Sequence, residues 1–114
     1  AFNRTVDADD RRTTMFGTVA RLQVKPGHQQ ALMDLQNNWD DTRDPASVGA
    51  KAVFVFQSER DPNEHTLVAV FRDRDAYFAN ANDPEQDRWY RQMREHLEAD
   101  PEWVDGEVIA SEMF

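Results

Sequence analysis

Hydrophobic residues near the start of the chain first follow a strand-like and then a helix-like spacing. From Met15 to Val24, apolar and polar positions alternate, which predicts a strand. Lys25-Pro26-Gly27 should end this strand, because proline has no N–H for a ladder and glycine eases the turn. Apolar positions then repeat at helical spacing up to Asp44-Pro45, so we expect a helix with one face made by His28, Leu32, Leu35 and Trp39.

Two strongly apolar segments indicate a β-hairpin. Residues 51–58 and 65–72 are rich in β-branched and aromatic side chains, and Arg60-Asp61-Pro62-Asn63 between them favours a turn. Both faces of these segments are apolar; in the first, Val53 and Val55 alternate with Phe54 and Phe56. Helices on one side of a sheet would leave one of these faces in water, so something else should cover it.

The second half of the chain predicts two helices. Asp73 is a suitable N-cap for a short helix that ends at Ala81. Asp83-Pro84-Glu85-Gln86 offers a cap, a proline at the first helical position and a glutamine at the third, so a longer helix should run from there to about Ala99. The apolar stripe of this longer helix would be Trp89, Met93 and Leu97.

A last strand over residues 107–114 should follow Pro101 and complete the order β-α-β-β-α-α-β. This order matches an α+β ferredoxin-like sandwich, in which an antiparallel sheet carries helices on one face. A second copy of the chain would cover the other face of the hairpin, so we expect a homodimer with a buried area near or above about 1,600 Å².

Composition narrows the range of partners. The 114 residues include 22 acidic and 13 basic side chains, and the net charge of −9 disfavours nucleic acid and anionic membranes as partners. There is no Cys and no apolar run long enough for a membrane span, so we expect a cytoplasmic domain without disulfides. Residues 58–114 hold the whole negative charge, which predicts a solvated acidic surface or, alternatively, a docking site for a basic partner.

We expect residues 1–14 to form a polar N-terminal arm or extension and residues 15–114 to form the folded domain. Motifs for metals and nucleotides are missing from the sequence. His28, His65 and His96 stand far apart and lack an HxxxH or ExxH partner, and the chain has no GxGxxG, Walker or GxSxG motif. We therefore expect neither a metal nor another cofactor.

Five segments carry a resemblance to a known family. They read MFGTVARLQVKPG (15–27), DPNE (61–64), FRDRDAY (71–77), DPEQDRWY (83–90) and ADPEWVDGE (99–107). Together they resemble the antibiotic biosynthesis monooxygenase (ABM) family over residues 15–110. The resemblance implies a dimeric α+β barrel, which agrees with the argument from the doubly apolar hairpin.

Activities differ within the family that the chain resembles. Some members oxidise polycyclic phenols to quinones without metal or flavin, others open haem, and others have no known activity. Haem-degrading members use an Asn, a Trp and an iron-ligating His. In this chain the corresponding positions fall at Ala20, near Asn80 and near Tyr90, so none of the three family residues is matched. His96 remains the nearest alternative iron ligand, and it also fits an ordinary half-exposed helix histidine.

Cofactor-free oxygenation needs an electron-rich substrate, an apolar pocket and a proton donor or acceptor. Tyr77 and His96 are the candidate catalytic residues, because both can hydrogen-bond a phenol, and an inward Arg21 could stabilise a phenolate. The candidate substrate-binding residues are apolar or aromatic, although such stripes also suit a plain core: Trp39, Phe54, Phe56, Phe71, Trp89, Tyr90 and Met93.

Three hypotheses follow. The first is a cofactor-independent monooxygenase of the ABM type that acts on a small phenol- or quinol-like aromatic compound. The second is a non-catalytic dimer of the same fold that binds a hydrophobic small molecule. The third is a structural dimer, which should lack a cavity of about 300 Å³ or more between helices and sheet.

Overall fold

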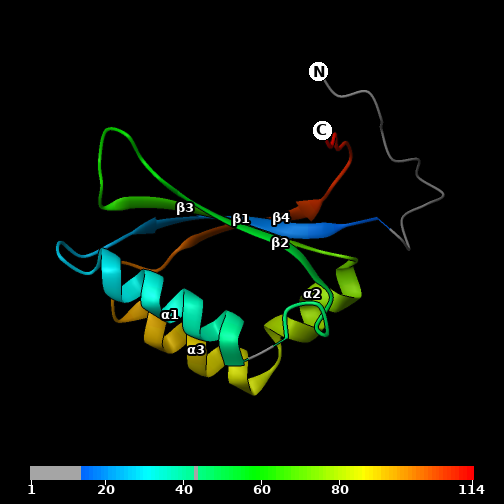
Figure 1. Cartoon of the computed structure of the whole chain (residues 1–114), viewed down its shortest axis with the longest axis horizontal. Helices are drawn as coiled ribbons and strands as arrows, with labels where there is room; N and C mark the ends of the chain where they lie inside the picture. The colour runs from blue at the N-terminus through cyan, green and yellow to red at the C-terminus, as the bar shows by residue number, and fades with distance from the viewer. Residues whose placement is uncertain (1–13, 43) are drawn as a thin grey trace.

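The chain forms an α+β sandwich in the computed structural model, which describes residues 14–42 and 44–114. Within these residues, three helices lie on one face of a four-stranded antiparallel sheet (Figure 1). The elements are β1 (Phe16–Gln23), α1 (Gln29–Thr42), β2 (Ala50–Gln57), β3 (Glu64–Phe71), α2 (Arg74–Ala81), α3 (Pro84–Arg94) and β4 (Glu102–Glu107). The predicted element order and ferredoxin-like fold are confirmed.

Most of the predicted N-terminal arm, residues 1–13, lies outside the described residues, and Thr14 is buried. None of the helices in the described residues is both long enough and apolar enough to span a membrane.

The sheet has the strand order β2-β3-β1-β4, so β1 and β3 are its central strands. The alternation predicted for β1 is confirmed: Phe16, Ala20 and Leu22 are buried, whereas Arg21 and Gln23 are exposed. The buried set faces the helices together with alternate residues of β3, because Phe16 pairs with Phe71, Ala20 with Leu67 and Leu22 with His65.

The last strand lies earlier in the chain than the sequence indicates. The prediction of a strand over residues 107–114 is wrong, because β4 is formed by Glu102–Glu107, which pair antiparallel with β1. Every residue of β4 is exposed, as befits an edge strand, so its sequence lacks the apolar signal of a buried strand. The N–H of Val108 still donates to the carbonyl oxygen of Met15 at 2.8 Å, and the chain then runs to its end on the side of the sheet away from the helices (Figure 1).

The helix α3 ends at Arg94, which is earlier than the predicted Ala99. The following backbone extends the sheet instead: Leu97 forms a bridge with Val24, and the N–H of Glu98 donates to the carbonyl of Gln23 at 2.8 Å. The guanidinium of Arg94 donates to the carbonyl of Leu97 at 2.9 Å and to Asp100 at 2.6 Å, which holds this turn.

Both predicted N-caps are confirmed. Asp73 accepts a hydrogen bond from the N–H of Ala76 at 2.7 Å, and Asp83 accepts one from the N–H of Glu85 at 2.8 Å. Each cap contributes about 1 kcal/mol. The side chain of Gln86, at the third position of the longer helix, accepts a hydrogen bond from the indole N–H of Trp39 at 2.7 Å.

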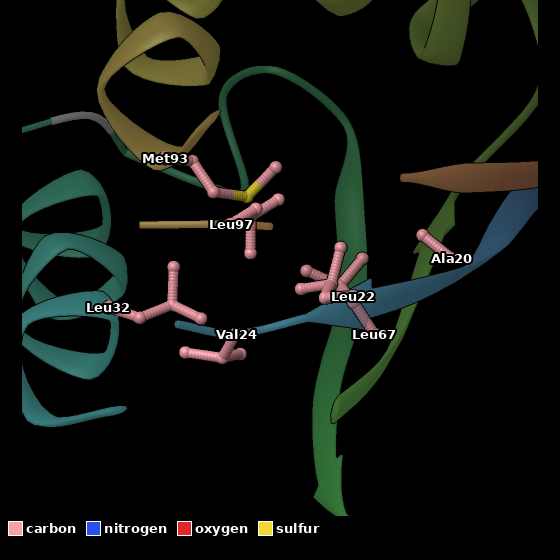
Figure 2. Packing of buried hydrophobic residues seen from close by; sticks show 7 residues of the cluster. All are labelled: Ala20, Leu22, Val24, Leu32, Leu67, Met93 and Leu97. Atoms are coloured by element: carbon pink, nitrogen blue, oxygen red, sulfur yellow. The ribbon is translucent and has the colours of Figure 1, made fainter. Parts of the chain in front are cut away.

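The hydrophobic core lies at one end of the sandwich. Figure 2 shows its buried side chains converging between β1, β3, α1 and the end of α3: Ala20, Leu22, Val24, Leu32, Leu67, Met93 and Leu97. These contacts fix α1 and α3 to one end of the sheet, and the core cluster does not extend to the other end.

The sheet face away from the helices is strongly apolar. Phe54 and Phe56 on β2 are 58% and 59% exposed, and Val19 on β1 and Val104 on β4 are exposed beside them on the same face. The prediction that one face of the hairpin remains uncovered in a single copy is therefore confirmed.

Candidate functional site

A cavity of about 400 Å³ lies between the sheet and the three helices, beyond the core cluster. Side chains from all four strands and all three helices of the described chain line it. Seven aromatic side chains line it: Trp39, Phe71, Tyr77, Phe78, Trp89, Tyr90 and Trp103. A purely structural domain should lack a cavity above about 300 Å³, so this volume favours a ligand-binding function.

Small side chains in the middle of the sheet create this space. Thr18 and Ala69 are paired neighbours on the helix face, and Ala20 follows on the next row. Larger residues lie on either side of this small patch, with the Phe16–Phe71 pair before it and Leu22 after it. The helices rest on the larger side chains, so the volume above Thr18 and Ala69 stays open.

Tyr77 brings a hydroxyl group to the wall of this cavity. Its ring packs against Phe16 and Phe71, with centroids 5.2 and 5.6 Å away, and its O–H donates to Oδ1 of Asp105 at 2.9 Å. This hydroxyl therefore has a polar partner within the chain. Burial and the hydrogen bond to Asp105 raise the pKa of Tyr77 to about 12, although a hydrogen bond from Thr18 acts in the opposite direction. The Tyr77 hydroxyl is therefore protonated at neutral pH.

The raised pKa predicts a late step in an alkaline titration. The folded chain holds the Tyr77 proton more tightly than the unfolded chain, in which tyrosine titrates near about 10. This contribution to stability is complete below pH 10 and is lost as the pH rises to about 12. Tyrosinate absorbance should show a step near pH 12 that Tyr77→Phe removes, with circular dichroism to verify folding. A late step that survives in Tyr77→Phe would contradict the assignment.

Other polar groups either support the wall or face the cavity. The indole N–H of Trp89 donates to the carbonyl of Leu35 at 3.2 Å, and the ring of Trp89 contacts Trp39 edge-on at 6.4 Å. These contacts fix two aromatic rings of the wall. Asn80 is 9% exposed, and its Oδ1 has no hydrogen-bond partner within the described chain. Because a buried acceptor without a partner is costly, Asn80 is suited to accept a hydrogen bond from a bound molecule.

The structure brings five of the nine predicted site residues to the cavity: Trp39, Phe71, Tyr77, Trp89 and Tyr90. Trp89 and Tyr90 are neighbours on α3 and diverge, yet both line the cavity because it extends over the side of the helix that faces α1 and the side that faces β4. The contacts of Trp89 with Trp39 and of Tyr90 with Trp103, at 6.2 Å, mark these two sides.

The other four predicted site residues lie outside the cavity. Phe54 and Phe56 are on the opposite sheet face, and Met93 is 1% exposed within the core cluster. His96 lies beyond the end of α3, where its Nδ1 is 3.0 Å from Nδ1 of His28. Arg21 also points away from the helices and forms an ion pair with Glu64, so the conditional role suggested for an inward Arg21 does not arise.

Sequence reasoning missed Thr18, Asn80 and Asp105. Asp105 reaches Tyr77 only because β4 pairs with β1, with Asp105 opposite Thr18. The sequence offers no signal for this contact, because the order Glu102, Trp103, Val104, Asp105 does not alternate polar with apolar residues.

Comparisons with known proteins agree with this fold. The family model described as antibiotic biosynthesis monooxygenase matches residues 15–92. A crystal structure named antibiotic biosynthesis monooxygenase has a TM-score of 0.68 at 18% identity and covers 82% of this chain and 98% of its own.

Two further structures of similar fold come from named organisms. A conserved protein from Methanosarcina mazei Go1 has a TM-score of 0.70 at 18% identity and covers 86% of this chain and 96% of its own. The NE2512 protein of unknown function from Nitrosomonas europaea has a TM-score of 0.70 at 22% identity, with 90% and 96% covered. No curated protein matches the sequence.

Proposed function

Because the chain belongs to the antibiotic biosynthesis monooxygenase family, we propose that it oxidises a small phenol- or quinol-like aromatic compound without a cofactor. The observation that carries this proposal is the Tyr77–Asp105 hydrogen bond at the wall of an aromatic cavity. A hydrogen-bonded phenol and carboxylate can move a proton, and the surrounding rings favour a flat apolar substrate.

The shape and lining of the cavity support this substrate class. A volume of about 400 Å³ lies within the range of small-molecule sites, and its wall offers rings from three helices and two strands. The unpartnered Oδ1 of Asn80 supplies an acceptor for a substrate hydroxyl. An aromatic compound with at least one hydroxyl group would therefore satisfy both the apolar wall and the buried polar atom.

The proposed reaction needs no electron donor other than the substrate. A phenol and O₂ give a quinone and water: one oxygen atom forms a new carbonyl on a ring carbon, and the other leaves as water. The phenol O–H bond and one ring C–H bond break, and both protons end on that water. The ring supplies every electron that O₂ takes up, so the atoms and electrons balance.

Tyr77 and Asp105 have complementary roles in this scheme. Asp105 accepts the phenol proton, which produces the electron-rich phenolate that can transfer an electron to O₂. Tyr77, whose raised pKa keeps it protonated, donates its O–H to the peroxide oxygen that leaves. Asp105 then returns a proton to Tyr77 through their 2.9 Å hydrogen bond, which restores the pair.

Oxygen uptake tests this function directly. Purified metal-free protein should consume O₂ when a panel of polycyclic phenols and quinols is added, and mass spectrometry should find the quinone with one atom of labelled oxygen. The corresponding methyl ethers should not react, because they have no phenol proton to lose. Saturable binding of the phenols without O₂ uptake would reject catalysis and assign the alternative function, a non-catalytic carrier of hydrophobic molecules.

We also propose that the apolar sheet face is the interface of a homodimer. Phe54, Phe56 and Val104 are exposed on one continuous face, and burying such a face against a second copy is favourable. Phe54→Asp should therefore convert a dimer to a monomer in native mass spectrometry, because it places a charge within the contact. Asn37→Asp on the exposed side of α1 adds the same charge away from that face, so this control should remain dimeric. A monomeric native chain would reject this interface.

A further inference from the structure

Two histidines meet at the end of the molecule that holds the core, away from the cavity. His28 precedes α1 and His96 follows α3, yet their Nδ1 atoms are 3.0 Å apart and their ring centroids 5.3 Å apart. Both side chains are only half-buried, so solvent and ions can reach them. Neither residue lines the cavity or takes part in the proposed oxidation.

The backbone of Lys25 fixes both histidines in place. Its N–H donates to the carbonyl of His96 at 2.9 Å, and its carbonyl accepts the N–H of His28 at 3.0 Å. The φ of 83° at Gly27 allows the tight turn between Lys25 and His28, which an L side chain would disfavour. The Val24–Leu97 bridge continues the same connection into the sheet. The two imidazoles are therefore brought together by backbone structure and not by side-chain packing alone.

We propose that His28 and His96 form a binding site for a divalent transition-metal ion, with Cu²⁺ as the preferred ion. Imidazole nitrogen is a good ligand for this class of ion. Two imidazole nitrogens bound to one ion at metal–nitrogen distances of about 2.05 Å lie about 2.9–3.3 Å apart, and the 3.0 Å between the Nδ1 atoms falls in this range. The centroid separation of 5.3 Å places the two rings head-on in an N–H···N hydrogen bond, so each ring must turn when the ion binds. Cu²⁺ is the preferred ion because it stands highest in the affinity order of divalent first-row metals.

The chain would supply only two of the ligands of the bound ion. No third His, Asp or Glu of the described residues joins the pair closely enough to complete a metal-binding group, so water would fill the other positions. Glu95 and Glu98 are exposed near His96 in the chain, and the net charge of −9 attracts cations, whereas Lys25 and Arg94 are the nearest positive charges along the chain. The ion would replace the hydrogen bond between the two facing Nδ1 atoms.

Copper titration of the untagged full-length chain tests the site. One Cu²⁺ should bind per chain, and electron paramagnetic resonance should show hyperfine coupling to two imidazole nitrogens. His28→Gln and His96→Gln should each weaken binding at least about 10-fold. The double variant measures copper held elsewhere, including the amino terminus. His65→Gln is the matched control, because His65 is 3% exposed on β3 and outside the pair, and it should leave the affinity unchanged.

A second measurement does not depend on whether the variants fold. In the native chain, Cu²⁺ should broaden the imidazole NMR signals of His28 and His96 before those of His65, and it should raise the melting temperature because only the folded chain holds the two rings together. Copper bound with fewer than two imidazole nitrogens, or equally by native and double-variant chains, would overturn the site. Tighter binding of Zn²⁺ than of Cu²⁺ would overturn the preference for Cu²⁺.

Discussion

Gly17→Ala should destabilise the chain by about 3 kcal/mol or more, the largest stability effect that we expect from a single methyl group. A Cβ at Gly17 would overlap the carbonyl oxygen of Ala69 and lie 3.1 Å from Cα of Val70. These are backbone atoms of the neighbouring central strand, so they cannot rotate away as a flexible side chain can. Relief requires β1 and β3 to separate, which would break ladder hydrogen bonds in the middle of the sheet.

Thermal unfolding followed by circular dichroism measures this effect. A loss of about 3 kcal/mol should lower the melting temperature by roughly 10 °C or more in a domain of this size. Gly106→Ala is the matched control, because Gly106 pairs with Gly17 across β1 and β4 and a Cβ there meets nothing within 4 Å. The control should be neutral or slightly stabilising, since alanine restricts the unfolded chain more than glycine does. Equal melting temperatures for the two variants would contradict the close approach of β1 and β3 at Gly17.

Spacing along the chain could predict the elements because most of them bury one side. The alternation in β1 and the stripe from Leu32 to Trp39 in α1 follow directly from contact with one core. β4 escaped prediction because it is an exposed edge strand, where burial imposes no apolar pattern. α3 was predicted too long because Leu97 is buried as a helix residue would be, although its burial comes from a bridge to Val24.

The site was only partly predictable for a related reason. Alternation shows that Val53 and Val55 lie opposite Phe54 and Phe56, but it does not show which set faces the helices when both sets are apolar. The aromatic residues of β2 were therefore assigned to substrate although they lie on the outer face. Tyr77 was predictable because a hydroxyl on an otherwise apolar helix face needs a partner. Its partner Asp105 was not, since their contact depends on the pairing of β1 with β4.

Tyr77→Phe should reduce the turnover number for phenol oxidation by about 10²–10⁴-fold while it changes substrate affinity by less than about threefold. The ring contacts with Phe16 and Phe71 remain in this variant, so the aromatic wall is preserved. Only the O–H that donates to Asp105 is lost, which should cost about 1 kcal/mol of stability. Because the proposed role is proton donation to the leaving oxygen, the loss should appear in kcat rather than in KM.

Tyr90→Phe is the appropriate comparison, because it removes the only other tyrosine hydroxyl of the chain from the same cavity. It should retain most of the activity.

Asp105→Asn should also lower kcat, because an amide cannot accept the phenol proton. The loss should be smaller for substrates whose phenol is already ionised at the assay pH. In the native chain, Tyr77 should cause no loss of rate until the pH approaches about 12, where its hydroxyl ionises. If Tyr77→Phe kept the native turnover number, Tyr77 would not be the proton donor. If kcat fell equally in Tyr77→Phe and Tyr90→Phe, the loss would come from a changed cavity wall and not from a missing proton donor.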